Sequence, residues 1–454
     1  MTEVAARESA GLRRWTVVGV LSMCVLVPFM DVTMISIDLP KIAAALHASP
    51  GQLQWIVISY IVACASGMLL VPALGGRWGQ RRTLVTGLVV FGAASLAAAY
   101  ATDVGWLLLW RVVMGAGASV VLPMRVSITT GLFPPEQRRR AFGIGTAVVA
   151  SATPLGPILG GALLEHSWWG SVFLINTGLV VLACPLLLVL VPEARAEQPH
   201  RADVAGVALA GAAVLAISAG LIDAAGGGRA WAAAWLALAA VLVIAFGVRQ
   251  RRAEHPLIEL SVLRVPRFVW SQLVIVLANL AWTGAMFVVP MYLETRLGVD
   301  PLGVGLRLLP FAGFVAVSSL LSDRVARRVG VRWVVIAGLL VFAAGLALLA
   351  FAVSAGDDAL ITVALGVAGF GGGIPQAPAL SAAMGSLPPK SARNGAGFIN
   401  ALRHFGGAFG VLAVGLVTVP AGALAERTGP AVLVLAVLLV FAAVLVVALP
   451  ERAE

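Results

Sequence analysis

The sequence predicts an all-α polytopic membrane protein, and three observations predict it. Of its 454 residues, 60% are hydrophobic and only 11% are charged, whereas a soluble domain has about 25% charged residues. Fourteen apolar stretches make up most of the chain, and each is long enough to cross about 30 Å of hydrocarbon at roughly 1.5 Å per residue. The loops between them are short, so they leave no room for a soluble catalytic or sensory domain.

The apolar stretches follow one another with few interruptions. They cover residues 15–39, 53–74, 84–101, 105–132, 141–164, 170–191, 203–223, 230–248, 268–294, 303–322, 333–354, 359–386, 395–419 and 428–449. The first follows a basic segment, as the apolar region of a signal peptide does, but it is too long for one and is expected to remain as a span. Cys24, Cys64 and Cys184 lie inside apolar stretches, so neither a disulfide nor a metal site is expected.

The basic residues are divided unequally between the two sides of these spans. Of 31 Lys and Arg residues, 23 fall in segments on the side of the N-terminus. Four others lie on the opposite side: Lys41, Arg229, Arg296 and Arg427. The remaining four lie inside the spans: Arg111, Arg125, Arg307 and Arg403. The positive-inside rule therefore places both termini in the cytoplasm. Because the charge is spread loop by loop, the lipid bilayer and not nucleic acid is the expected partner.

Two sequence matches indicate an internal duplication. Residues 132–143 match residues 386–397, including a Pro-Pro pair, at a constant offset of 254. The short loop at residues 77–81 matches residues 328–332 at an offset of 251. Two matches so far apart with nearly the same offset predict two halves of six spans each.

The duplication leaves one pair of spans unmatched in the middle of the chain. We therefore expect residues 1–191 to form an N-terminal six-helix bundle and residues 268–454 a C-terminal one. Residues 192–267 would supply two extra transmembrane helices with cytoplasmic linkers. Paired helical halves that rock against each other around a site at the membrane midplane are the architecture of secondary transporters.

Five segments carry a resemblance to a known family. Residues 30–40, MDVTMISIDLP, are similar to its signature L-D-x-T-V-x-N-V-A-L-P, and residues 74–82, LGGRWGQRR, to its gating loop G-x-L-a-D-R-x-G-R-R. Residues 111–117, RVVMGAG, resemble R-x-x-Q-G-x-G, and residues 145–161, which end PLGPILGG, resemble G-x8-G-P-x-x-G-G. Residues 403–410 resemble a stretch of its span thirteen. The chain thus resembles the fourteen-helix drug:proton antiporter branch of the major facilitator superfamily.

The resemblance implies a fold and a function. The fold would be the major facilitator fold, with two pseudo-symmetric six-helix bundles plus two extra central helices. The function would be proton-coupled antiport, in which lipophilic drugs or natural products are exported by alternating access, by a monomer without a cofactor in a bacterial inner membrane. The alternative is a facilitator or importer of a small polar or anionic metabolite. An enzyme is not expected, because the five histidines are scattered and form no catalytic cluster.

Several positions depart from the family pattern. Gly76 stands where the gating loop has Asp, and the corresponding position of the second half is Arg327. We expect Asp323 to replace the missing acid in part. Met114 stands where the span-four motif has Gln, a change toward an apolar cavity wall.

Asp31 and Arg111 are the candidate proton-coupling pair. Asp31 lies roughly 24 Å along the first span, where an ionised carboxylate costs about 2.5 to 3.5 kcal/mol unless it faces a cavity or a partner. Burial favours the neutral form of a carboxyl and so suits it to carry a proton. Arg111 reaches a similar depth and stays charged, so its approach would keep Asp31 ionised. The alternatives are an acid that only hydrogen-bonds Thr33 or a neighbouring helix, and a permanent structural ion pair.

The other candidate residues fall into three groups. The candidate substrate cavity comprises Met30, Met34, Trp55, Met114, Arg125, Arg403 and His404. The antiporter motif comprises Gly145, Pro154, Gly156, Pro157, Gly160 and Gly161, which would kink and tightly seat the fifth span. The cytoplasmic gate comprises Arg77, Gly79, Arg81, Arg82 and Asp323. Core packing, general helix packing and membrane topology are the respective alternative explanations.

The charges inside the spans limit the substrate. Four arginines against one deep acid favour a lipophilic compound that is neutral or carries a single charge, rather than a dication. The remaining acids near the outer ends of spans are expected to be solvated: Asp38, Glu165, Asp223 and Glu294.

Overall fold

The computed structural model describes residues 2–194, 203–253, 257, 260–387, 392–418 and 427–448. These residues form helices joined by short loops. The first nine elements are α1 (Thr2–Leu46), α2 (Pro50–Met68), α3 (Val71–Trp78), α4 (Gln80–Ala99), α5 (Val104–Ala118), α6 (Val121–Leu132), α7 (Pro135–His166), α8 (Ser171–Leu190) and α9 (Val204–Ala225). The others are α10 (Arg229–Arg252), η1 (Leu260–Arg264), α11 (Pro266–Thr295), α12 (Pro301–Val329), α13 (Val331–Ala355), α14 (Asp358–Gly373), α15 (Gln376–Gly385), α16 (Ala392–Thr418) and α17 (Thr428–Ala448).

Among the described residues, thirteen helical segments are long and apolar enough to cross a membrane. Two of these segments each join two elements across a short irregular turn, namely α5 with α6 and α14 with α15. Helix α7 is a further helix of 32 residues, but many of its side chains lie outside the described part. The helical, multi-pass architecture predicted from hydropathy is confirmed.

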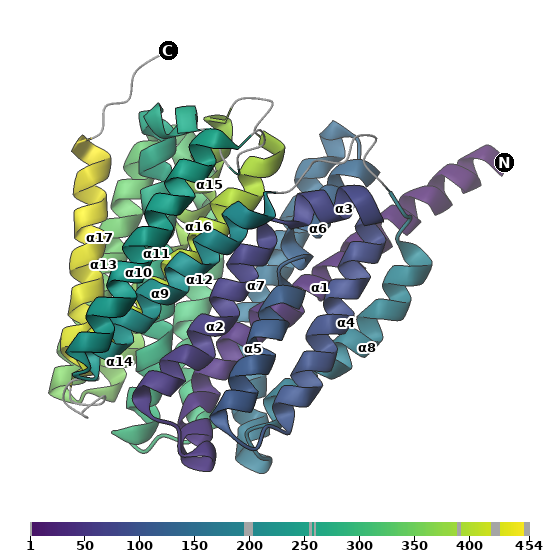
Figure 1. Cartoon of the computed structure of the whole chain (residues 1–454). Helices are drawn as coiled ribbons and strands as arrows, with labels where there is room; N and C mark the ends of the chain where they lie inside the picture. The colour runs from purple at the N-terminus through teal and green to yellow at the C-terminus, as the bar shows by residue number, and fades with distance from the viewer. Residues whose placement is uncertain are drawn as a thin grey trace.

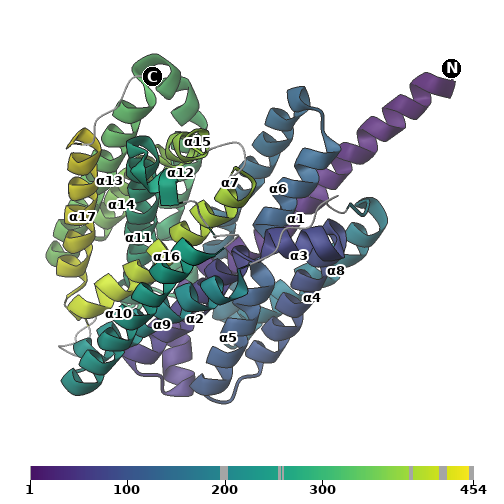
Figure 2. The same ribbon diagram turned by 45° about the horizontal axis from the view of Figure 1, so that its top comes forward.

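The start of α1 and the end of α17 lie at the same end of the helical bundle (Figure 1). We call this the terminal end, and the opposite end, where α1 finishes and α2 begins, the distal end. Helices α13, α14 and α17 pack together on one flank, and α4 and α8 pack together on the other (Figures 1 and 2). Between the two flanks, α7 contacts α12, α2 contacts α16, and α1 contacts α11.

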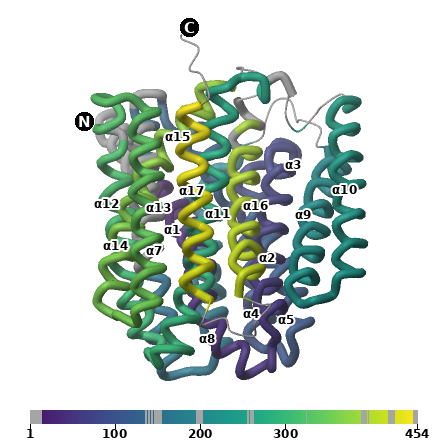
Figure 3. Tube along the Cα trace, turned by 90° about the vertical axis from the view of Figure 1, so that its left-hand side faces the viewer, coloured from purple at the N-terminus to yellow at the C-terminus, as the bar shows by residue number. Residues whose placement is uncertain are grey.

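The two helices between the matched halves form a peripheral hairpin. Helix α9 packs against α10, and it also contacts α2 and α16; the pair stands at the edge of the molecule in Figure 3. Helix α10 exposes most of its apolar surface, including Trp231 at 70%. The hairpin is thus central in the sequence but lies at the edge of the folded chain.

The loops at Gly79 and Gly330, which match in the sequence, have the same local geometry. Gly79 has φ 102° and ψ 149°, and Gly330 has φ 93° and ψ 146°; backbone with such a positive φ favours glycine. The arginine two residues after each glycine also binds equivalently. Arg81 donates to the carbonyls of Leu188 and Val191 at the end of α8. Two carbonyls at the end of α17 accept from Arg332, those of Val446 and Val447.

These arginines satisfy carbonyls that a helix leaves unpaired in its last turn. We expect Arg332→Gln to lower the free energy of unfolding by about 1 kcal/mol, since a cation at a helix C-terminus contributes about 0.3 to 1 kcal/mol and two hydrogen bonds are also lost. Thermal unfolding of the purified protein in detergent measures this. Arg324→Gln, at an exposed position on α12 before its last turn, is the control and should leave the midpoint unchanged.

Candidate functional site

Asp31 and Arg111 form an ion pair in the interior of the membrane-spanning region. Arg111 Nη1 lies 2.6 Å from Asp31 Oδ2, and both residues are 0% exposed. Asn176 on α8 donates through Nδ2 to the other carboxylate oxygen at 2.9 Å. Both carboxylate oxygens therefore accept a hydrogen bond, so the polar atoms of this buried carboxyl are satisfied.

Arg111 is held in place by two further contacts with α2. Its Nε donates to the carbonyl of Ile56 at 3.1 Å, and its guanidinium lies 4.2 Å from the centre of the Tyr60 ring. A cation over a desolvated aromatic face is stabilised by about 2 kcal/mol. The sequence suggested that Asp31 faces a cavity, but the structure encloses the ion pair among α1, α2, α5 and α8. A proton can reach Asp31 only if these helices shift.

The pairing of Asp31 with Arg111 follows the sequence prediction, whereas Asn176 and Tyr60 were not identified. Asn176 had a usable signal, because it is an amide inside the apolar stretch 170–191, and polar groups inside spans usually have a partner. Tyr60 is one of only three tyrosines in the chain. Nothing in the sequence indicates which face of α2 it occupies.

The contacts of Arg111 depend on the shape of its side chain. We expect Arg111→Lys to lower transport about tenfold, because an ammonium cannot bind Asp31 and the Ile56 carbonyl in the same fixed geometry or stack on Tyr60. A tenfold change corresponds to about 1.4 kcal/mol. Initial rates in membrane vesicles, normalised to the amount of folded protein, measure the effect. A rate equal to that of the wild type would show that only the charge matters.

The antiporter motif of α7 lies between α1 and α12. A Cβ built on Gly156 would meet the Thr33 hydroxyl, and one built on Gly160 would lie 3.3 Å from the Met34 side chain. The adjacent face of α7 contacts α12 instead. A Cβ on Gly161 would lie 2.6 Å from the Pro301 carbonyl oxygen. The glycines thus allow α7 to approach α1 on one face and α12 on the other.

Other close contacts between the two halves also occur toward the distal end. A Cβ on Gly305 of α12 would lie 2.5 Å from the Pro157 carbonyl oxygen of α7. Gln54, near the start of α2, is packed against Gly415, near the end of α16. The halves are therefore in tight backbone contact at the distal end in this conformation.

The candidate cavity residues differ in how deeply they are buried. Met30, Met34 and Met114 are buried, and Met34 and Met114 are 0% exposed. Trp55 is half-buried, and Arg125 on α6 is 7% exposed.

Arg403 and His404 are consecutive residues of α16, and both are half-buried. Arg403 Nε donates to Asn279 Oδ1 at 3.3 Å, while Asn279 Nδ2 donates to the Arg403 carbonyl at 2.8 Å. This reciprocal pair links α16 to α11 and fixes the base of the arginine side chain.

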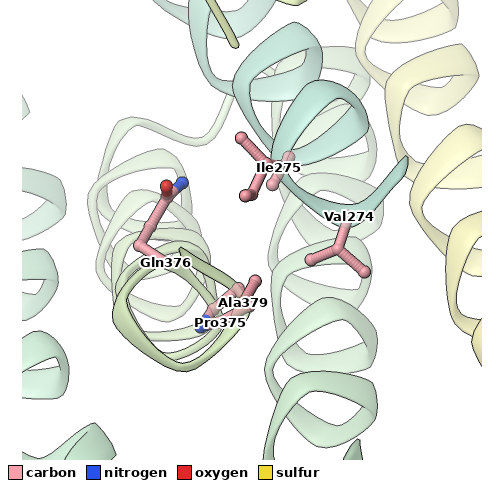
Figure 4. A pocket seen from close by; sticks show the side chains of 6 residues that line it. Val274, Ile275, Pro375, Gln376 and Ala379 are labelled. Atoms are coloured by element: carbon pink, nitrogen blue, oxygen red, sulfur yellow. The ribbon is translucent and has the colours of Figure 1, made fainter. Parts of the chain in front are cut away.

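A small notch lies between α11 and α15 (Figure 4). Val274, Ile275 and Ala278 line it on α11, and Gln376 and Ala379 line it on α15, with Pro375 just before that helix. Its empty volume of about 120 Å³ is below the roughly 300 Å³ of the smallest usual ligand pockets. A drug-sized compound would need a conformation in which this region is wider.

The predicted gate residues bind within their own half. The carboxylate of Glu193, which follows α8, accepts from the backbone N–H groups of Arg81 and Arg82 at 3.1 and 3.2 Å. It thereby places a negative charge at the N-terminus of α4, where the helix dipole favours one. Arg77 is exposed. Three predicted site residues lie in helices but outside the part of the chain whose side chains are described: Gly145, Pro154 and Asp323.

The expectation that Asp38 is solvated is wrong. Asp38 is 0% exposed, because α1 continues two turns beyond it to Leu46 and neighbouring helices cover it. Glu294 is half-buried, and its buried Oε2 has no hydrogen-bond partner in the described part of the chain. By contrast, Glu165 is exposed, as expected.

The family model described as Major Facilitator Superfamily matches residues 21–411. Among curated proteins, the tetracenomycin C resistance and export protein of Streptomyces glaucescens is 32% identical over 76% of this chain and 65% of its own length. The methylenomycin A resistance protein of Streptomyces coelicolor is 31% identical over 86% and 82%. The multidrug efflux pump LfrA of Mycolicibacterium smegmatis is 30% identical over 92% and 85%.

Solved structures share the fold at low sequence identity. A D-xylose-proton symporter is matched with a TM-score of 0.72 and 15% identity, over 96% of this chain and 98% of the other. A bacterial homologue of the human lysosomal transporter Spinster, in an inward-facing and occupied conformation, is matched with a TM-score of 0.69 and 16% identity, over 95% and 96%. These neighbours are transporters, and at this identity the likeness concerns the fold alone.

Proposed function

Because the chain belongs to the major facilitator superfamily and is a multi-pass membrane transporter, we propose that it is a proton-coupled exporter of lipophilic drugs or natural products. The observation that carries the proposal is the buried ion pair between Asp31 and Arg111 at 2.6 Å. Relatives named for antibiotic resistance, export and multidrug efflux support the substrate class. The cargo would be lipophilic and neutral or singly charged, with protons as the second ligand.

The proposed topology has fourteen spans, with α7 as the fifth. Residues 1–191 and 268–454 would be the two six-helix bundles, and residues 192–267 would add the peripheral hairpin and its linkers. The terminal end would face the cytoplasm of a bacterial cell, because it carries most of the Lys and Arg residues. The distal end would then face outward.

In this orientation, the described conformation is closed on the outside. The contacts of Gly161 and Gly305 between α7 and α12 would form the outer seal. Asp31 would be ionised here, because it binds both Arg111 and Asn176. This is the state expected after a proton has been released to the cytoplasm and before a drug has been bound.

The transport cycle would follow from the movement of Arg111 relative to Asp31. When the helices shift and the outside opens, the ion pair would separate, and Asp31 would take a proton from the outer solution. Neutral Asp31 carries no charge that must stay in contact with water, so the halves can return to the outward-closed arrangement. Renewed approach of Arg111 would then expel the proton toward the cytoplasm.

Everted membrane vesicles test this function. With an imposed pH gradient, acid inside, a lipophilic monocationic dye that reports on drug uptake should accumulate, and each addition should release protons from the vesicle. Accumulation that persists after the gradient is collapsed would exclude proton coupling.

The alternative, a facilitator or importer of an anionic metabolite, draws on one observation. Arg403 binds the Asn279 amide, and its half-buried guanidinium could attract an anion. That function predicts movement of an organic anion into right-side-out vesicles. It also predicts that adding a lipophilic cation to everted vesicles releases no protons.

A further inference from the structure

The distal end of α1 holds a buried acid that the transport cycle above does not use. Asp38 is 0% exposed, and neither of its carboxylate oxygens has a hydrogen-bond partner within the described residues. An unpartnered ionised carboxylate in such surroundings costs several kcal/mol. A carboxyl with this environment is stable when it carries a proton.

Two charged groups lie close enough to act on Asp38, namely Lys41 on its own helix and Glu294 on α11. Lys41 Nζ donates to the Leu164 carbonyl of α7, and among the described residues it forms no ion pair with Asp38. Glu294 contributes a second, partly buried carboxyl from the other half of the molecule. The cluster therefore spans the boundary between the halves.

The other charged groups near this end are occupied or exposed. Glu165 and His166 at the end of α7 are exposed, and so is Arg296 after α11. Arg307 of α12 is paired with Asp358 of α14 at 2.5 Å. Lys41 and Glu294 are thus the groups that set the charge balance around Asp38.

We propose that Asp38, with Lys41 and Glu294, forms a second proton-binding site that controls closure of the outer seal and is distinct from the Asp31 site. This proposal rests on the proposed function, which supplies the orientation of the protein in the membrane and the transport cycle in which the second site would act. When the distal end opens, water reaches Asp38 and its carboxylate can exist ionised. A proton from the outer solution then neutralises it, and only the neutral carboxyl can be buried against α7 and α11.

The proposal makes closure of the distal end depend on external pH. Acid outside favours the closed arrangement, and this proton returns to the outside when the seal reopens, so it is not part of the transported stoichiometry. The carboxylate of Glu294 raises the affinity of Asp38 for the proton, while the ammonium of Lys41 lowers it. Removing the carboxylate of Glu294 and removing the ammonium of Lys41 should therefore shift the pH of closure in opposite directions.

Distances between spin labels at the distal end test the proposal directly. The labels are placed on Ser167→Cys, after α7, and Arg296→Cys, after α11, in a background where Cys24, Cys64 and Cys184 are replaced by Ala. The reconstituted full chain is measured without drug from pH 5 to pH 8. The short-distance population should predominate at low pH and decline as pH rises.

The variants separate a titrating carboxyl from a packing residue. Asp38→Asn should keep the short distance at every pH, while Glu165→Gln should behave as the wild type. Glu294→Gln should lower the midpoint of the pH transition, and Lys41→Met should raise it. A packing role would change the short-distance population equally at all pH values.

Two outcomes would overturn the proposal: a wild-type distance that does not change with pH, or an Asp38→Asn variant with the wild-type transition. If Asp38→Asn does not fold, the opposite shifts in the Glu294 and Lys41 variants still decide. Asp31→Asn should keep the pH transition of the seal. Absence of antiport in the wild type, with an intact pH transition of the seal, would therefore contradict the proposed function without contradicting the second site.

Discussion

Asp31→Asn is expected to abolish proton-coupled export, with the rate falling at least a hundredfold, while the protein still folds. The amide cannot take up or release a proton, so transport can no longer be driven by a pH gradient. Its oxygen can still accept from Arg111. Its new N–H groups can bind Asn176 Oδ1, which is buried and has no hydrogen-bond partner among the residues that the structure describes. The cost of breaking a buried ion pair, about 3 to 5 kcal/mol, is therefore offset in part.

The measurement is gradient-driven dye accumulation in everted vesicles, together with thermal unfolding of the purified variant. Glu165→Gln removes an exposed acid from the same end of the molecule and should retain wild-type transport. An Asp31→Asn variant that still accumulates dye in response to the gradient would show that the proton is carried elsewhere.

Gly161→Val should cause the second large loss, through the contact between α7 and α12. A Cβ at this position would lie 2.6 Å from the Pro301 carbonyl oxygen and 2.8 Å from Leu302 Cα, and backbone atoms cannot move aside as a flexible side chain can. Overpacking of this kind costs about 1 to 3 kcal/mol, which corresponds to a roughly five- to 150-fold shift away from the arrangement that is closed at the distal end. Export should fall by a similar factor.

Proteoliposomes can report both export and passive proton leak for this variant. Leak should rise, since the seal between α7 and α12 no longer closes. Gly305→Val should reproduce the effect from the other helix, because its Cβ would meet the Pro157 carbonyl oxygen at 2.5 Å. Gly178→Val, which has open space around it, is the control. Normal export by both Gly161→Val and Gly305→Val would contradict a sealing role.

The sequence predicted the helical architecture well because hydrophobic length is a strong local signal. Each predicted apolar stretch coincides with a helix or a pair of consecutive helices. The repeat was visible at Gly79 and Gly330 because a positive φ restricts the choice of residue. The ion pair between Asp31 and Arg111 was predictable because buried charges require partners, and few were available.

Features set by packing between distant helices were not predictable. Asp38 was expected in solvent because the predicted span ended at residue 39, whereas α1 continues to Leu46. The burial of Met34 and Met114 depends on which face of each helix meets its neighbours. A single sequence with apolar residues on nearly every face of a span does not specify how each helix is rotated about its own axis.

Drug-driven proton movement through the reconstituted transporter tests the central claim most directly. In proteoliposomes with no imposed pH gradient, a gradient of a lipophilic cation should drive protons in the opposite direction through the wild type, detectable with a pH-sensitive dye, and none through Asp31→Asn. Equal proton movement through the two proteins, or none through a wild type that transports the compound, would contradict the assignment of Asp31 as the proton carrier.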